Sequence, residues 1–441
     1  MRSYLVFLLI FSTIPAIFFK PHVGILIWSW VSYMNPHRLT WGFAYNFSFL
    51  VFVAAATLVS AFMSKEPKKL PNHPLIWLLF IYFFWTTLTT IVAAYPEMAW
   101  VKWERVAKTF LFTILTVMFM QSKGRLHALL WVIVLSMGYF AMKGGLFTII
   151  SAGAHRVWGP PATFFADNNH FALAMCMILP LVRYLQLHSD NRYIRWFMGS
   201  MLFFGFFSIF GTHSRGALVG ITAMVLFLVW KSKRILFGLG VVVVVVGIGY
   251  WFMPQSWHDR MATIADYEND ASATGRLDMW KFAIDVANDA PILGGGYDIF
   301  YHEGYRAAYL PEGVKGRAAH SIWFEVLGEH GYVGLLLFLL LGITTYFTCS
   351  AIIQRCRDHP DLRWARDFAA MLQVGLVGFA TAGTFLNVAT FDLYYHMVVM
   401  AVLIRVLVDR ELAARGAEPA PAVPVRTGPF KPAIAPRGGG G

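Results

Sequence analysis

Charged residues are scarce in this sequence. Asp, Glu, Lys and Arg make up 14% of the 441 residues, whereas hydrophobic residues make up 58%. Soluble globular domains carry roughly 25% charged residues, so the composition excludes an ordinary soluble protein. Cysteine is also rare, with three residues. We expect Cys176 and Cys349 inside membrane spans and Cys356 in a cytoplasmic loop, which leaves no disulfide on the outer side.

Signals for metal or nucleic-acid binding are weak as well. Lys and Arg outnumber Asp and Glu by 36 to 24, a formal net charge of +12, but they are dispersed among short loops rather than gathered on one face. No His pair four residues apart lies beside a glutamate, and no cysteine cluster occurs. The acidic run Asp266, Glu268 and Asp270 could hold a divalent cation, although hydrated loop carboxylates are the commoner explanation. We expect no metal, no cofactor and no nucleic acid.

Apolar stretches of the length that crosses a bilayer recur along the whole chain. Each needs about 20 residues, and we count about twelve of them. The first is interrupted at Lys20, so it forms either one broken span or a re-entrant hairpin, and no signal-peptide cleavage pattern follows it. The stretches are 4–33, 43–63, 74–94, 104–121, 127–151, 171–187, 195–212, 216–230, 235–253, 321–350, 367–386 and 393–408. The predicted fold class is an all-α integral membrane protein with about 12 transmembrane helices and one large periplasmic loop containing amphipathic helices.

Basic residues in the short loops indicate the cytoplasmic side. With this number of spans, those loops fall on the same side as both termini. We therefore divide the chain into transmembrane helices 1–9 at 1–253, the large periplasmic loop at 254–320, transmembrane helices 10–12 at 321–410 and a disordered cytoplasmic tail at 411–441. The outward loops 152–170 and 254–320 are the expected working parts, because other connections are short.

The large loop contains a predicted amphipathic helix from about Thr274 to Asn288. Arg276 falls on its apolar face and in its first turn, where the helix dipole disfavours a cation. A bound anion would suit both the guanidinium and the free N–H groups of the helix start; alternatively, Arg276 snorkels or pairs with a carboxylate. The expected apolar face holds Leu277, Trp280, Ala283, Ile284 and Ala287, and the opposite face holds Asp278, Lys281, Asp285 and Asp289.

Two further arginines stand at outward ends of spans, Arg156 in "GAHRVWGPP" and Arg215 in "GTHSRGALVG". Arginine at membrane depth is costly and usually faces an interior cavity with a partner. Together with Arg276, they suggest an anionic ligand at the membrane surface. Snorkelling toward lipid headgroups is the alternative for each arginine taken singly.

Polar residues near the same outward level are candidates for contacts with an acceptor or a sugar. Asp167, Asn168 and Asn169 precede span six, where they could cap the helix or bind sugar hydroxyls. Trp280 and Tyr297 could stack on sugar rings, but we favour a role in packing the loop.

His320 lies at the junction of the large loop and span ten, where a neutral imidazole can accept a proton. Glu325 and Glu329 lie about 140–180° away around the helix, so we expect them to pair with arginines on another helix. His330 has no assigned role. Asp392, at the same outward level, could orient His320 or neutralise an arginine.

Three segments occur in a fixed order around the large loop: "SRGALVG" at 214–220, "ATGRLDMWKFAIDVANDAPILGGGY" at 273–297 and "AHSIWFEVLGEHGYVGLL" at 319–336. In this order and spacing the chain resembles the O-antigen ligase and polymerase superfamily. The segment "RVWGPPATFFADNNHFAL" is also similar to the O-glycosylation ligases associated with exosortase systems. The resemblance covers roughly 150–400, and the family's outward arginines fall on Arg215 and Arg276 and its loop histidine on His320.

The resemblance implies a bacterial inner-membrane protein whose active site faces the periplasm. The implied donor is a glycan on undecaprenyl diphosphate, with no metal and no nucleotide sugar. Arg156, Arg215 and Arg276 would bind the diphosphate, and His320 would act as the base on a hydroxyl of lipid A-core or of a protein, with inversion at the anomeric carbon. An O-antigen polymerase shares these motifs. A lipid-linked glycan transporter is the alternative from another class, although transporters place charged residues near the membrane midplane.

Overall fold

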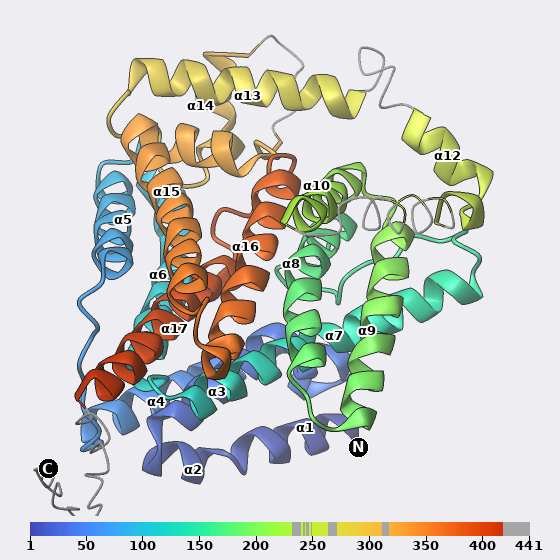
Figure 1. Cartoon of the computed structure of the whole chain (residues 1–441). Coiled ribbons are helices and arrows are strands. Elements are labelled where there is room, and N and C mark those ends of the chain that lie inside the picture. The colour runs from blue at the N-terminus through green and yellow to red at the C-terminus, as the bar shows by residue number, and fades with distance from the viewer. Residues whose placement is uncertain are drawn as a thin grey trace, which may run out of the picture.

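The computed structural model describes residues 1–231, 240, 243, 247, 249–262, 271–310 and 317–417. In these ranges the regular elements are helices and no strand occurs, so the all-α prediction is confirmed. Figure 1 shows their arrangement. The α-helices are α1 (Arg2–Phe11), α2 (Ile14–Phe19), α3 (Pro21–Met34), α4 (Phe49–Met63), α5 (Pro74–Ile91), α6 (Pro96–Phe119), α7 (Lys123–Ile150), α8 (Asn168–Leu187), α9 (Arg192–Gly211), α10 (Arg215–Lys231), α12 (Gln255–Ala262), α13 (Ala271–Asp289), α14 (Glu303–Ala307), α15 (Ile322–Arg355), α16 (Arg363–Gly383) and α17 (Asp392–Ala417). The short 3-10 helices are η1 (Pro36–Leu39), η2 (Phe43–Asn46), η4 (Ile299–Tyr301) and η5 (Pro360–Leu362).

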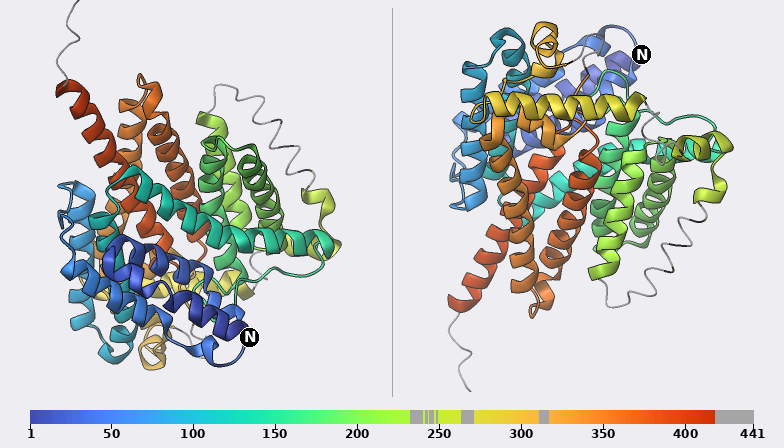
Figure 2. Two further views of the ribbon diagram at one scale, coloured as in Figure 1. Left: turned by 90° about the horizontal axis from the view of Figure 1, so that it is seen from below. Right: turned by 90° about the horizontal axis from the view of Figure 1, so that it is seen from above.

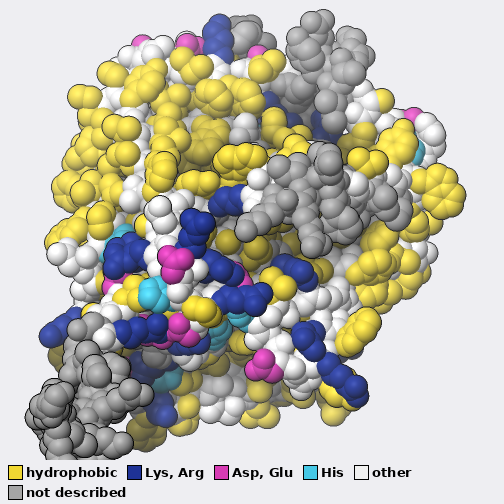
Figure 3. Space-filling model, viewed as in Figure 1, with side chains coloured by type: hydrophobic (Ala, Val, Ile, Leu, Met, Phe, Trp, Pro, Cys, Tyr) yellow, Lys and Arg dark blue, Asp and Glu magenta, His cyan; other side chains and the backbone are white. Residues whose placement is uncertain are grey.

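Six helical segments of the described chain are long and apolar enough to cross a membrane: α1 with α2, α5, α7, α8, α9 and α15. The protein is therefore a multi-pass membrane protein by length and composition. Figure 3 shows a broad area of hydrophobic side chains, with Lys and Arg side chains gathered below it near the lower ends of α15 and α16. The number of about 12 spans and the periplasmic side of the large loop stay predictions.

The N-terminal segment folds back on itself. The chain turns at Lys20, whose backbone is extended between α2 and α3. The Ser3 hydroxyl donates a hydrogen bond to the carbonyl of Trp41, which follows the end of α3. The beginning of α1 thus lies beside the segment of η1 and η2 that follows α3. Residues 2–34 therefore form helical arms joined at Lys20, and the choice between one broken span and a re-entrant hairpin stays a prediction.

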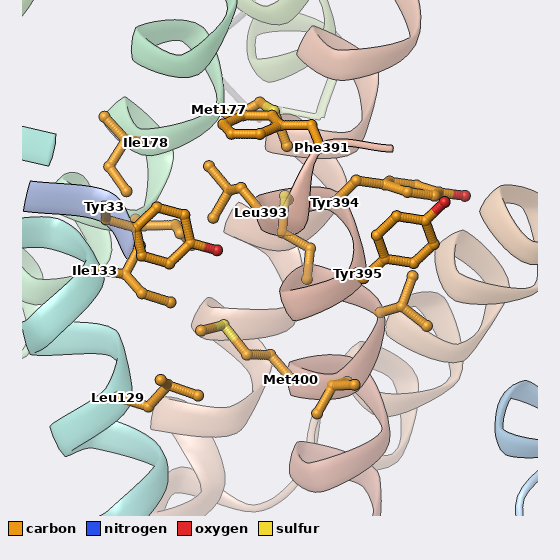
Figure 4. Packing of buried hydrophobic residues seen from close by; sticks show 14 of the residues in the cluster. Tyr33, Leu129, Ile133, Met177, Ile178, Phe391, Leu393, Tyr394, Tyr395 and Met400 are labelled. Carbon is orange, nitrogen blue, oxygen red and sulfur yellow. The ribbon is translucent and has the colours of Figure 1, made fainter. Parts of the chain in front are cut away.

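The core of the bundle forms around α17. Figure 4 shows Leu393, Tyr394 and Met400 of α17 among buried side chains of α3, α7 and α8, including Tyr33 and Ile133. This packing encloses the first half of α17 on several sides. The helix continues to Ala417, past residue 411 where the predicted tail begins, and residues 418–441 lie outside the described chain.

Helix α13 lies across one end of the bundle, above the start of α15 (Figures 1 and 2). The predicted helix is confirmed, but its buried face is displaced from the expected one. Ala283 and Ala287 of the expected face are fully buried, but Leu277 is 48% exposed and Ile284 is 38% exposed, whereas Met279 and Phe282, which were not expected there, are fully buried. The reason is that α13 packs through Phe282 onto the Phe300 ring. The acidic run at 266–270 lies outside the described residues.

Helix α15 breaks at Gly331, where φ is 68° and ψ is −173°. The glycine run of the large loop makes this break possible. Gly295 N–H donates to the Gly328 carbonyl and Gly296 N–H donates to the Glu329 carbonyl, both at 2.9 Å. These bonds satisfy two carbonyls that the break removes from the helical pattern. A Cβ on Gly331 would lie 2.6 Å from the Ile292 carbonyl oxygen, so glycine is required there.

Candidate active site

The side chain of Trp280 attaches the segment before α15 to α13. The indole N–H of Trp280 donates to the Ala319 carbonyl at 2.9 Å. Its ring stacks on Phe324 with 4.8 Å between centroids. Trp280 therefore packs the loop, as its amphipathic ring suits, and it fixes the backbone immediately before His320.

His320 has a left-handed backbone with φ of 47°, an uncommon conformation that persists where surrounding contacts enforce it and that clusters at functional sites. The next residue, Ser321, is the N-cap residue of α15. Burial, together with the charges of Arg276, His170 and Arg317, lowers the pKa of His320 to about 4, against an opposing effect of Asp167. The imidazole is therefore neutral at physiological pH, and the charges of Arg276 and Arg317 act on it.

Arg276 and Arg317 supply the positive charge around His320. A Cβ at Gly275 would lie 3.0 Å from a terminal guanidinium nitrogen of Arg317, so this glycine admits Arg317 against α13. Arg276 lies next to it in the sequence and is partly buried. The charge of Arg276 acts on His320, and the predicted role of both residues in one site stays a prediction. Arg317 was missed by the sequence analysis, although it stands only three residues before His320.

The start of α8 lies between His320 and a neighbouring turn. Asp167 caps this helix, accepting hydrogen bonds from the backbone N–H groups of Asn169 and His170. Asn168 is buried and its amide donates to the Thr212 carbonyl at 2.7 Å. Asn169 donates to the Asp167 carboxylate at 3.1 Å. These residues have structural partners, and Asp167 also acts on the charge of His320.

A second basic group surrounds the turn between α9 and α10. His213 is buried there with φ of 54°, and burial and the charges of Arg156 and Arg260 lower its pKa. The Arg260 guanidinium donates to the His213 carbonyl at 3.1 Å. Arg215 follows as the first residue of α10. Arg156 and Arg215 thus belong to this second group, which Asn168 connects to the surroundings of His320.

Glu325 and Glu329 were expected to pair with arginines, but they pair with a lysine. Lys102 of α6 lies 2.9 Å from a Glu325 oxygen and 2.7 Å from a Glu329 oxygen, and 3.5 Å from Asp298. The other Glu325 oxygen accepts the N–H of Ala389. This buried group attaches the first part of α15 and the large loop to α6. A single lysine in the apolar stretch "AWVKWERV" was the available signal for it.

Tyr297, Asp392 and His330 have partners other than the charged groups around His320. Tyr297 is 3% exposed and packs edge-on against the His330 ring, 4.4 Å between centroids. His330 is hydrogen bonded to the hydroxyl of Thr89 at 2.7 Å. Asp392 accepts a hydrogen bond from Thr109 of α6 at 2.8 Å. All three side chains have partners that link α15, α17 or the loop to α5 and α6.

In a comparison with known proteins, the part of the chain that holds this site matches a family model. Residues 200–339, which include Arg276, Arg317 and His320, match the family model described as O-Antigen ligase. Residues 1–190 match the model of a family of unknown function (DUF5935). Over 87 residues the chain is 26% identical to the exopolysaccharide production protein ExoQ of Rhizobium meliloti (strain 1021), a match that spans 18% of this chain and 20% of that protein. This part of the chain is similar to the O-antigen ligase superfamily, which supports a function of the ligase or polymerase type.

Proposed function

We propose that this protein is a glycosyltransferase of the bacterial inner membrane that moves a glycan from undecaprenyl diphosphate to a hydroxyl acceptor on the periplasmic side. The observation that carries the proposal is the placement of neutral His320 beside Arg276 and Arg317, inside the segment that matches the ligase family. Such a site combines a proton acceptor with two cations that suit a diphosphate. Metal independence is part of the proposal and rests on the family resemblance.

The arginines would act on the leaving group. When the bond from the anomeric carbon to the diphosphate breaks, its electron pair remains on the diphosphate oxygen and negative charge increases there. Guanidinium groups form paired hydrogen bonds to phosphate oxygens, and donors already in place stabilise such charge without reorganisation. Arg276 and Arg317 would bind the diphosphate beside His320, and Arg215 and Arg156 belong to the adjoining basic group.

His320 would accept the proton of the acceptor hydroxyl as its oxygen attacks the anomeric carbon. A single displacement of this kind inverts the configuration at that carbon. A pKa of about 4 makes His320 a weak base before the donor binds. A diphosphate beside Arg276 and Arg317 offsets their charge, which favours the protonated imidazole and raises the basicity of His320. Proton transfer is thereby linked to occupation of the donor site.

An apolar groove beside the site suits the carrier lipid. It lies between α15, α16 and α17, and its walls include Trp323, Phe338, Phe379 and Tyr394. Trp323 follows His320 by three residues, and its indole N–H donates to the Thr384 hydroxyl at 2.9 Å. The groove therefore begins close to the proposed reaction centre, where the first isoprene units of the donor would lie.

The acceptor separates a ligase from a polymerase. Lipid A-core is the acceptor we favour, and a protein hydroxyl is the variant suggested by the resemblance to exosortase-associated ligases. The similarity to an exopolysaccharide production protein supports a second candidate function, that of a polymerase that joins one lipid-linked glycan to another.

A transfer assay in proteoliposomes tests the proposal. Purified protein is given undecaprenyl-diphosphate-linked glycan with either lipid A-core or a second lipid-linked glycan, and products are separated by mass. We expect transfer by the wild type and by a His155→Ala control, whose histidine is exposed, and none by His320→Ala. Full activity of folded His320→Ala would overturn the proposed role of this residue, and no transfer to any hydroxyl acceptor would overturn the function.

A further inference from the structure

A second site lies away from the basic groups, on the side of the molecule where α3, α7 and α9 meet. These helices enclose a groove of about 710 Å³ whose walls include Trp30 and Met34 of α3, Leu135 of α7, and Phe197 and Phe204 of α9. Figures 1 and 2 show α7 crossing α9 at a steep angle. The walls are almost entirely apolar, and Leu135 and Phe197 are 44% exposed, as expected of a surface that faces lipid chains.

Three polar side chains of α7 interrupt this apolar surface. Ser136, Tyr139 and Lys143 line the groove at spacings of three and four residues, so they occupy one face of the helix. Along the axis, Lys143 lies about 6 Å from Tyr139 and about 10 Å from Ser136, at roughly 1.5 Å per residue. The groove therefore combines one cation with two hydroxyl groups in a row along one face of α7.

Two of these polar groups, Ser136 and Lys143, lack partners that would explain them. Ser136 is 3% exposed, and its hydroxyl has no hydrogen-bond partner in the described part of the chain. Lys143 is exposed in the middle of an apolar surface, and among the described residues its ammonium group makes no ion pair or hydrogen bond. An ionisable group inside a membrane-spanning segment ordinarily has an oppositely charged partner or contacts a ligand.

Close packing of α7 on α9 keeps the groove in place. Cβ atoms at Gly138 and Gly145 would overlap Met201 and Phe204 of α9, so these glycines allow the two helix backbones to approach. The groove is thus a fixed feature of the packed helices rather than a gap between loosely joined ones.

We propose that this groove binds an anionic glycerophospholipid, with its phosphate group at Lys143 and its acyl ester carbonyls at the hydroxyls of Tyr139 and Ser136. The negative headgroup complements the single cation, and the ester carbonyls supply the acceptors that the two hydroxyls need. Acyl chains would cover the apolar walls. A polyprenyl phosphate matches less well, because it has no hydrogen-bond acceptors below its phosphate. This site is separate from the proposed transferase site and does not depend on its function.

Native mass spectrometry of the full-length purified protein tests the proposal with three added lipids: phosphatidylglycerol, phosphatidylcholine and the dialkyl-ether form of phosphatidylglycerol. We expect the wild type to bind ester-linked phosphatidylglycerol about tenfold more tightly than phosphatidylcholine, and Lys143→Met to lose this preference. Lys108→Met, which removes an exposed lysine of α6, should retain it. The wild type should bind the ether lipid more weakly than the ester lipid. A Ser136→Ala, Tyr139→Phe double variant should bind the two lipids equally.

Three results would overturn the proposal. Equal phosphatidylglycerol binding by Lys143→Met and the wild type would show that the lysine is not the headgroup partner. Displacement of phosphatidylglycerol by an equimolar polyprenyl phosphate would assign the groove to the carrier lipid instead. A dimer that dissociates in Lys143→Met, without any lipid preference, would make the groove a contact between copies of this chain. A matching far-ultraviolet circular dichroism spectrum for each variant ensures that these comparisons concern folded protein.

Discussion

Replacing Lys102 with Met should destabilise the protein through the two glutamates that it leaves behind. The Lys102 ammonium lies 2.9 Å from Glu325 and 2.7 Å from Glu329, whose residues are 3% and 2% exposed. Removing one partner of a buried ion pair costs about 3–5 kcal/mol, because an uncompensated charge stays in a medium of low polarity. We expect Lys102→Met to lower the free energy of unfolding in mixed micelles by that amount.

A triple variant separates charge from shape. Adding Glu325→Gln and Glu329→Gln to Lys102→Met removes the stranded charges, while each glutamine keeps a carbonyl oxygen. Those oxygens can still accept the N–H groups of Ala389 and Asp298, which the glutamates accept in the wild type. We expect the triple variant to recover at least half of the lost stability. The reasoning is refuted if Lys102→Met unfolds like the wild type, or if the triple variant is no more stable than Lys102→Met.

Three shorter predictions concern the loop and its junction with the bundle. With a His320 pKa of about 4, kcat/KM should be flat between about pH 6 and 8 and fall at lower pH as His320 becomes protonated. Because Arg276→Gln removes a cation, it should raise the pKa of His320 and move the acidic limb of the profile to higher pH. An unmoved limb would exclude His320 as the titrating base. Gly331→Ala should lower the thermal midpoint, because its φ of 68° alone costs about 1–3 kcal/mol, whereas Gly124→Ala, with open space around its Cβ, should not. Trp280→Phe keeps an aromatic ring but loses the indole N–H, so kcat should fall with a stability loss of only about 1 kcal/mol; equal kcat would show that this hydrogen bond does not position the loop.

The sequence predicted those features that depend on local patterns. Apolar length indicated a helical membrane protein, and the spacing of apolar residues located α13 to within a few residues at each end. The prediction of which face α13 buries was partly wrong. Periodicity shows that a helix is amphipathic, but the partner surface decides which residues of its apolar sector are covered, and here Phe300 and Phe324 are that surface.

The candidate site shows a similar division. Arg276 and His320 were selected from chain position and chemistry, and in the structure the charge of Arg276 acts on His320. Lys102 was missed because its partner Glu325 lies 223 positions away in the sequence, a separation that no local pattern reveals. The break at Gly331 was missed for the same reason, since it depends on backbone bonds from the distant glycine run.

Donor binding tests the central claim most directly, because it isolates the role of the cations from the chemistry. The affinity of the purified protein for undecaprenyl diphosphate and undecaprenyl monophosphate can be measured by microscale thermophoresis in the same detergent. We predict that the wild type prefers the diphosphate, that the Arg276→Gln, Arg317→Gln double variant binds it about tenfold more weakly, and that His320→Ala binds it nearly as well as the wild type. Unchanged diphosphate affinity in the folded arginine double variant would contradict the account.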